Sequence, residues 1–167
     1  ARAGNAPLRG FKGSTWEGGM REPTIAWWPG KIPADTVTDE ICGMMDILPT
    51  LVKLAGGKTP TDRKLDGGDI WPLLTGKPGA KSPHDVFYYF RGFKLEAVRS
   101  GPWKLHLGVA GPANAKKKQQ APPKQQLFNL ATDIGEGADA SDAHPDVVKR
   151  LRELADGMKD DLGLDGI

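Results

Sequence analysis

Between Val86 and Leu107 the sequence reads VFYYF, KLEAV and WKLHL, three short runs rich in aromatic and aliphatic residues. The connections between these runs, RGF and RSGP, have the length and the turn residues of hairpins. A later run, QLFNL at 126–130, has the same character. Because strands joined by hairpins pair with their sequence neighbours, we predict a four-stranded antiparallel sheet.

The end of the chain predicts an amphipathic helix over 145–162. Pro145 suits the first turn of such a helix, and the apolar residues that follow recur at helical spacing on one face. That stripe consists of Val147, Val148, Leu151, Leu154, Met158 and Leu162. We expect it to pack on the sheet, which makes 85–167 an antiparallel-sheet subdomain.

The first half of the chain has a different character. Thr24–Trp28 is a short apolar run closed by Pro-Gly, the pattern of a strand buried on both faces of an α/β sheet. Apolar residues then recur at helical spacing over 44–55, where Asp46 can cap the start and a Gly-Gly pair ends the helix. One strand and one helix do not complete a sheet. We therefore predict an α/β fold of which this α+β chain holds only the end.

Composition excludes several classes of protein. The chain has 22 Gly and 14 Pro, which indicates many loops, and its 23 basic and 21 acidic residues give a formal net charge of +2. This balance does not predict a nucleic-acid-binding surface. The single cysteine, Cys42, excludes an internal disulfide. No apolar run approaches the length of about 20 residues that a membrane-spanning helix needs.

The segment PLRGFKGSTWEGGMREP, from Pro7 to Pro23, contains one isolated lysine, Lys12. Gly10, Gly13 and Ser14 around it permit close backbone approach to a ligand, and a lysine is a compact charge for a phosphate or sulfate oxygen. A solvent-exposed loop lysine explains the same pattern. The segment lacks the glycine-lysine-hydroxyl spacing of a nucleotide-binding P-loop.

Four ordered motifs give the chain a family resemblance. LRGFKGSTWEGGMREPTIAWWPGKIPA, MMDILPTLVKLAG, LDGGDIWPLLTG and AVRSGPWKLHL together cover most of the sequence. They resemble the C-terminal portion of a type I sulfatase of the alkaline phosphatase superfamily, of the arylsulfatase A and N-acetylgalactosamine-6-sulfatase kind. The resemblance implies that residues 1–84 are the C-terminal part of the catalytic α/β domain and that 85–167 are its C-terminal subdomain.

The resemblance also implies an activity and a site. Members hydrolyse sulfate esters with a formylglycine made from Cys or Ser in a Cys/Ser-x-Pro-x-Arg motif, while calcium and basic residues stabilise the anionic transition state. Lys12 occupies the lysine position of the family's Gly-x-Lys-Gly-x-Thr loop, which contacts the sulfate. Cys42 lacks the required proline and arginine, so we expect a small buried side chain there. The family's calcium ligands have no counterparts, so no metal site is predicted in this chain.

The resemblance implies a sulfate ester substrate, possibly a sulfated sugar, and the remainder of the sulfatase as a partner. It implies a periplasmic, secreted or lysosomal location. We expect the isolated chain to be inactive. A non-catalytic module that binds sulfated glycans, with Lys116–Lys118 as a basic loop, is an alternative, as is a phosphoesterase or phosphonate hydrolase of the same superfamily. Glu17 is predicted to hold the Lys12 loop in shape, and His84 to be a surface histidine.

Overall fold

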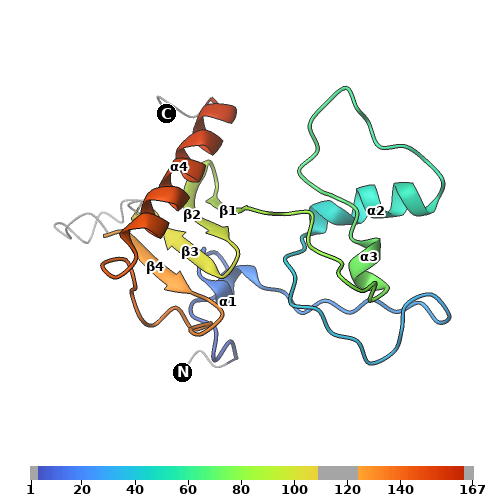
Figure 1. The fold of residues 1–167 in the computed structure, drawn as a ribbon, viewed down its shortest axis with the longest axis horizontal. Helices are drawn as coiled ribbons and strands as arrows, with labels where there is room; N and C mark the ends of the chain where they lie inside the picture. Colours follow the sequence, from blue (N-terminus) through green and yellow to red (C-terminus); the bar gives the residue numbers. More distant parts are fainter. Residues whose placement is uncertain (1–3, 109–123, 164–167) are drawn as a thin grey trace. The chain divides into compact units, whose positions relative to one another are not determined.

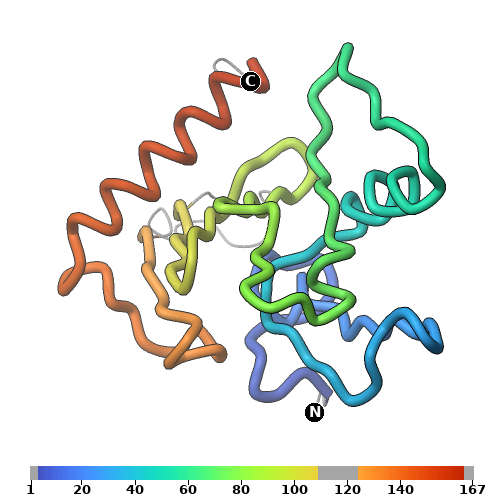
Figure 2. Tube along the Cα trace, turned by 45° about the vertical axis from the view of Figure 1, so that its right-hand side comes forward, coloured from blue at the N-terminus to red at the C-terminus, as the bar shows by residue number. Residues whose placement is uncertain are grey.

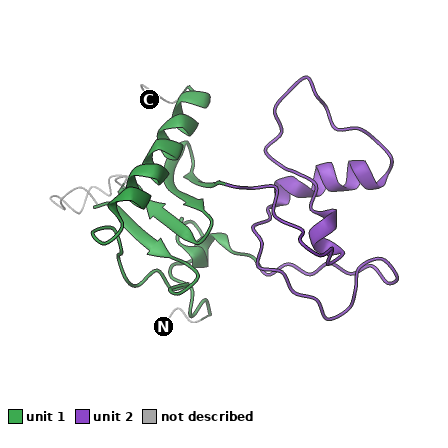
Figure 3. Ribbon diagram, viewed as in Figure 1, with its two compact units in different colours: residues 1–22, 86–167 green, residues 23–85 purple. Residues whose placement is uncertain are grey.

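The computed structural model describes residues 4–108 and 124–163. The chain forms two compact units, one of residues 1–22 and 86–167 and the other of residues 23–85 (Figure 3). We call them the sheet unit and the helical unit. The helical unit ends at residue 85, one residue after the predicted boundary between 84 and 85, and the first 22 residues group with the sheet. The assignment of 1–84 to one incomplete catalytic domain stays a prediction.

The sheet unit contains a four-stranded antiparallel sheet in the order β1-β2-β3-β4 (Figure 1). Its strands are β1 (Phe87–Arg91), β2 (Lys94–Ser100), β3 (Trp103–His106) and β4 (Gln126–Asn129). Gly92 and Gly101 lie in the two tight turns, each with a positive φ that a side chain would disfavour. The predicted meander is therefore confirmed.

One face of this sheet is covered by the terminal helix α4 (Pro145–Asp161), which Figure 2 shows in red as one uninterrupted helix. Leu151 and Ala155 are fully buried in the core between α4 and the sheet. The strand residues of this core are Leu95, Val98, Leu105, Leu107 and Leu127. The predicted helix and its packing on the sheet are confirmed.

The opposite face of the sheet is covered by the N-terminal segment, which ends in the single helical turn α1 (Glu17–Met20). Side chains that alternate with the apolar core positions point to this side: Tyr89 from β1 and both Lys104 and His106 from β3 contact residues 15–17. The sheet is thus covered on both faces, by a helix on one side and by a loop and helical turn on the other.

The helical unit contains η1 (Met44–Asp46), α2 (Ile47–Leu54) and α3 (Trp71–Leu74). The predicted helix over 44–55 is present. Asp46 is the residue that precedes α2, but its side chain makes no capping hydrogen bond to the helix. Its buried carboxylate accepts hydrogen bonds from the backbone N–H groups of Gly43 at 2.6 Å and Gly68 at 2.8 Å, which ties the start of the helix to a later loop.

The predicted strand at Thr24–Trp28 is wrong for this structure. In the described part of the chain no strand pairs with this segment, and Ile25 and Trp27 are 93% and 84% exposed. An isolated extended segment gains no ladder hydrogen bonds, so the apolar pattern alone does not make a strand. The apolar side of α2 is open as well, with Leu48 61% and Leu51 56% exposed.

Candidate functional site

Lys12 lies exposed near the tip of a tight loop in the sheet unit. The Ser14 hydroxyl donates a hydrogen bond to the Phe11 carbonyl at 2.8 Å, and the Ser14 N–H reaches the same oxygen at 3.1 Å. Gly10 and Gly13 adopt φ values of +82° and +88°, which strain any residue with a side chain. Over the described residues, no hydrogen bond or ion pair engages the Lys12 ammonium. Ser14 and the two glycines thus close the loop locally, and Lys12 is exposed on it.

The helical turn α1 packs directly against this loop. The Gly18 N–H donates to the Arg9 carbonyl at 2.7 Å. A side-chain carbon at Gly18 would lie 2.6 Å from that same carbonyl, and one at Gly19 would lie 2.6 Å from the Phe11 carbonyl. Only glycine therefore allows α1 and the Lys12 loop to approach this closely, which explains the Gly-Gly pair that follows Glu17.

Beneath the loop lies a buried group of ionisable side chains that we call the Lys104 cluster, made of Glu17, Tyr89, Lys104, His106 and Glu136. The Lys104 side chain has no exposed surface. Its ammonium donates to the Thr15 carbonyl at 2.7 Å and to Glu17 Oε1 at 2.8 Å, and lies 2.9 Å from Glu136 Oε1. A buried lysine is tolerated only when all its protons find acceptors, as they do here.

The two glutamates of the cluster have further partners. Glu17 accepts hydrogen bonds from the Tyr89 hydroxyl at 3.1 Å and from Arg21 Nε at 2.6 Å. Glu136 accepts from the backbone N–H of Glu17 at 2.7 Å and lies 3.0 Å from His106 Nε2. The carboxylate of each glutamate therefore bonds groups that are distant in sequence. The predicted role of Glu17 in shaping the loop is consistent with this geometry.

The protonation of the cluster follows from burial and from its charges. Burial opposes ionisation of Glu17 and Glu136, but the charge of Lys104 and the hydrogen bonds they accept more than offset it, so the pKa of both lies below the ordinary value. Burial lowers the pKa of His106, with Lys104 acting in the same direction. Burial and the charge of Glu17 raise the pKa of Tyr89. Near neutral pH both glutamates are ionised, and His106 and Tyr89 are neutral.

An aromatic stack adjoins the cluster. The Trp16 ring lies on the His106 imidazole with centroids 3.9 Å apart, and the Arg9 guanidinium lies 3.7 Å from the Trp16 ring centroid. His106 therefore points away from Leu105 and Leu107, as its alternation with them predicts. Arg9 also donates to the Glu136 carbonyl oxygen at 2.8 Å.

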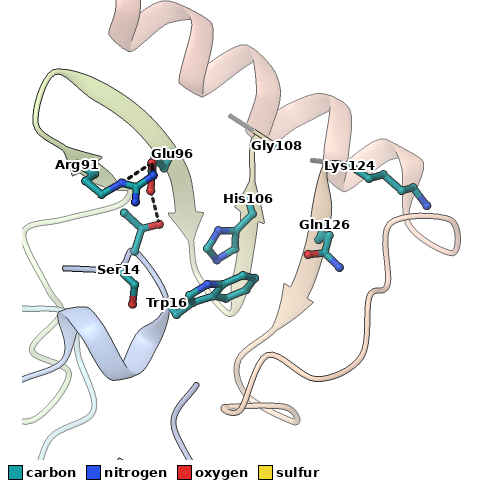
Figure 4. A pocket seen from close by; sticks show the side chains of 9 residues that line it. Ser14, Trp16, Arg91, Glu96, His106, Gly108, Lys124 and Gln126 are labelled. Carbon is teal, nitrogen blue, oxygen red and sulfur yellow. Dashed lines mark hydrogen bonds and ion pairs between the residues drawn. The ribbon is translucent and has the colours of Figure 1, made fainter. Parts of the chain in front are cut away.

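A small open pocket lies beside Trp16 and His106 (Figure 4). On one wall Glu96 accepts hydrogen bonds from the Thr15 hydroxyl at 2.9 Å and from Arg91 Nε at 2.7 Å. Ser14 and Gln126 also line it. Thr15 of the N-terminal segment and Glu96 of β2 are thus bonded to one another, and Lys12 does not line the pocket.

Two predictions outside this region need correction. His84 is not a surface histidine: its side chain is 8% exposed, and its Nε2 lies 2.7 Å from Asp46 Oδ1, because the loop before β1 folds back onto the start of α2. Cys42 is exposed rather than buried, since it lies in an extended segment without a helix over it. Lys116–Lys118 lie outside the described residues.

Sequence reasoning missed Lys104, Glu136 and Tyr89. The available signal was weak: Lys104 shares a strand face with His106, and Glu136 lies in the DIGEGADAS turn. Neither pattern indicates what covers that face.

The residues described here do not fit calcium or formylglycine. No group of three or more His, Cys, Asp or Glu in 4–108 and 124–163 is arranged to hold a metal ion. Partial desolvation of the Cys42 thiol, with Asp46 and Glu40 nearby, raises its pKa, and the sequence around it lacks the maturation motif. We therefore derive no chemical step through either group from this chain. Of the helices described, none has the length and apolarity to cross a membrane.

Two family models match the chain. Residues 1–57 match the model described as sulfatase, and residues 82–164 match the model described as the C-terminal region of aryl-sulfatase. The matched ranges contain the Lys12 loop, the whole sheet and α4.

Known proteins agree with these matches. The chain is 46% identical over 102 residues to N-acetylgalactosamine-6-sulfatase of Canis lupus familiaris, which covers 61% of this chain and 19% of that protein. It is 37% identical over 166 residues to arylsulfatase A of Homo sapiens, covering 88% and 32% respectively. The chain therefore spans a third or less of the length of these relatives.

A solved structure shows the same fold. The PsFucS1 sulfatase from Pseudoalteromonas sp. matches with a TM-score of 0.74 at 29% sequence identity, over 91% of this chain and 32% of that one. Sequence and structure thus agree over the Lys12 loop, the antiparallel sheet and the terminal helix: the chain belongs to the sulfatase family and has the mixed fold of its alkaline-phosphatase-like members.

Proposed function

We propose that this chain supplies the sulfate-contacting loop and the C-terminal sheet subdomain of a sulfuric ester hydrolase. The observation that carries the proposal is Lys12, whose ammonium is exposed on a tightly bonded loop inside the segment that matches the sulfatase model. The substrate is an aryl sulfate or a sugar sulfate, since one relative is named as an arylsulfatase and another for N-acetylgalactosamine-6-sulfate.

The proposed role of Lys12 is electrostatic stabilisation of negative charge on the substrate. A sulfate ester gains negative charge on its oxygens and on the leaving oxygen as the bond to sulfur breaks. A lysine ammonium fixed before substrate arrives stabilises that charge without reorganisation during the reaction. Gly13 leaves room for a sulfate next to the loop backbone, because a side-chain carbon there would meet nothing within 4 Å.

The whole protein is proposed to contain the rest of the catalytic apparatus. There, a formylglycine residue would supply the nucleophile and a bound calcium ion a further positive charge, as family membership implies. This chain's own contribution is to hold Lys12 in place. We expect the isolated chain to be inactive toward sulfate esters.

The partner of the chain is the remainder of the sulfatase, in which 1–84 would complete the catalytic α/β domain and 85–167 would be the C-terminal subdomain. The helical unit supports this proposal because it carries large exposed apolar side chains, which soluble proteins rarely leave in contiguous patches. The most exposed are Ile25, Trp27, Val37 and Met44, between 84% and 93%.

The test replaces Lys12 by alanine in the full-length protein and measures hydrolysis of an aryl sulfate. We expect kcat/KM to fall by about 100-fold, the range for losing one fixed donor to a developing anion. Lys77→Ala, an exposed lysine of the helical unit, is the matched control and should leave kcat/KM unchanged. A loss of less than threefold for Lys12→Ala would contradict the proposed role.

The same assay separates the alternative functions. A phosphoesterase or phosphonate hydrolase would turn over phosphate or phosphonate esters faster than sulfate esters in a matched panel. A glycan-binding module without turnover would bind sulfated oligosaccharides at low salt while the full-length protein releases no sulfate from any ester tested.

A further inference from the structure

The two ends of the Lys12 loop are fixed to the same buried cluster. At the start of the loop, Arg9 donates to the Glu136 carbonyl at 2.8 Å. At its end, Lys104 donates to the Thr15 carbonyl at 2.7 Å, and Glu136 Oε2 accepts from the backbone N–H of Glu17 at 2.7 Å. The loop between residues 9 and 17 is therefore held at both sides by one lysine and one glutamate that follow it by about ninety residues or more.

We infer that Lys104 and Glu136 are positioning residues of the proposed sulfatase: they set the place of the Lys12 ammonium relative to the sulfate without touching it. This inference rests on the proposed function of Lys12. It assigns the buried charges of the sheet unit a role in the reaction, in addition to their part in the fold.

The loop has little freedom to absorb a shift at its ends. Ser14 bonds the Phe11 carbonyl through both its hydroxyl and its N–H, and Gly18 and Gly19 press against the loop backbone with no room for a side-chain carbon. A displacement of residues 9, 15 or 17 must therefore move the Lys12 turn as well. Misplacement of a catalytic group by about 1 Å is enough to lower a rate by about 100-fold.

The cluster also uses features that packing alone does not need. Glu136 has a φ of +52°, a left-handed conformation that costs a non-glycine residue about 1 kcal/mol or more. The surrounding turn maintains it, because Asp133 accepts hydrogen bonds from the N–H groups of Gly137 and Ala138, each at 2.8 Å. This backbone directs the carbonyl of Glu136 toward Arg9 and its carboxylate toward Lys104, so a single residue serves both ends of the loop.

Charged side chains are better suited than apolar contacts to hold the Lys12 loop in one position. A buried ion pair is often no more stabilising than apolar residues of the same shape, but its hydrogen bonds are directional and fix one geometry. Near neutral pH the two ionised glutamates of the cluster face three cations: Lys104, the half-exposed Arg21 and Arg99, whose Nη1 lies 3.9 Å from Glu17 Oε2. Removal of one carboxylate charge changes the geometry of all its partners.

The test is a double-mutant cycle in the full-length protein, with aryl sulfate hydrolysis as the readout. Glu136→Gln keeps the shape of the side chain but places an amide where Lys104 and His106 meet the carboxylate. We expect kcat/KM to fall about tenfold in the wild-type background and by less than twofold in the Lys12→Ala background, because a displaced loop matters only while Lys12 is present. A purely structural defect would lower kcat/KM by the same factor in both backgrounds.

Two further variants keep the test decisive. Tyr89→Phe removes one hydroxyl bond to Glu17 and leaves the charges in place. If Glu136→Gln is unfolded by circular dichroism, we expect Tyr89→Phe to show the same dependence on Lys12 with a loss of about threefold. Glu40→Gln, which alters an exposed ion pair of the helical unit, is the control and should have no effect in either background.

The possible outcomes are distinct. If folded Glu136→Gln and Tyr89→Phe proteins keep wild-type kcat/KM, or lose the same factor with and without Lys12, the positioning role is overturned while a 100-fold effect of Lys12→Ala still supports the proposed function. If Lys12→Ala itself loses less than threefold, the proposed function fails, and the positioning role fails with it.

Discussion

At the scale of single residues, Gly19 shows how closely the Lys12 loop is packed. A side-chain carbon there would overlap the carbonyl oxygens of Phe11 and Ser14. Because backbone atoms cannot move aside as a flexible side chain can, we expect Gly19→Ala to destabilise the chain by about 1–3 kcal/mol. Urea unfolding of the chain, followed by circular dichroism, measures this.

Gly157 provides the matched control for this prediction. It lies exposed within α4, and an added carbon there would meet nothing within 4 Å. Gly157→Ala should stabilise the chain by about 0.5–1 kcal/mol, since alanine favours a helix interior. Equal unfolding midpoints for the two alanine variants would show that the close contact at Gly19 is absent in solution.

The pKa of His106 predicts how stability depends on pH. Burial holds this pKa below the ordinary 6.5, so the unfolded chain takes up a proton at a higher pH than the folded chain does. Stability should therefore fall as pH drops below about 6.5. A second loss should follow below about 4.5, where the unfolded-state counterparts of Glu17 and Glu136 protonate, because the folded pKa of both is lowered from 4.5.

Replacement of His106 distinguishes the stability loss below about pH 6.5 from the loss below about pH 4.5. His106→Gln should remove the loss that begins below about pH 6.5 and leave the loss that begins below about pH 4.5, as measured by urea midpoints in buffers of constant ionic strength. An unchanged profile for His106→Gln would mean that the imidazole is not held neutral against Trp16.

At the scale of elements, local patterns predicted what local contacts build. The strands of the sheet and α4 follow from hairpin-length turns and from a stripe of apolar residues, and the helix over 44–55 follows in the same way. Thr24–Trp28 failed because a strand requires a partner, and strand pairing is not a local property. The same apolar sequence can form a buried strand or an exposed segment, depending on which elements lie beside it.

The Lys104 cluster shows the same limit within the site. Alternation along β3 puts His106 on the face opposite to Leu105, and Lys104 shares that face. A face that carries Lys and His is usually solvent-exposed. Here the segment at 9–20 covers it, with sequence separations of 87 for Lys104 to Glu17 and 119 for Glu17 to Glu136. No spacing rule joins residues that distant, so the cluster emerged only from the structure.

At the scale of the whole molecule, the two units differ in how complete they are. The sheet unit buries an apolar core on one face of its sheet and the Lys104 cluster on the other. The helical unit instead exposes the side of α2 that carries Leu48 and Leu51, together with Ile25 and Trp27. If the proposed sulfatase is correct, these side chains are covered by the remainder of the catalytic domain in the full-length protein.

Trp27 reports on this proposal because its indole is 84% exposed in the chain. The fluorescence of Trp27 is obtained by subtracting the emission spectrum of Trp27→Phe from that of wild type. In the isolated chain, this fluorescence should have the long wavelength of a hydrated indole and be strongly quenched by acrylamide. In the full-length protein the same difference should shift to shorter wavelength and lose most of its quenching, because burial removes the ring from water. Trp103, which is half-buried in the sheet unit, gives the control through Trp103→Phe and should change little between the two proteins. Equal quenching of Trp27 in both proteins would mean that the remainder of the sulfatase does not cover this segment.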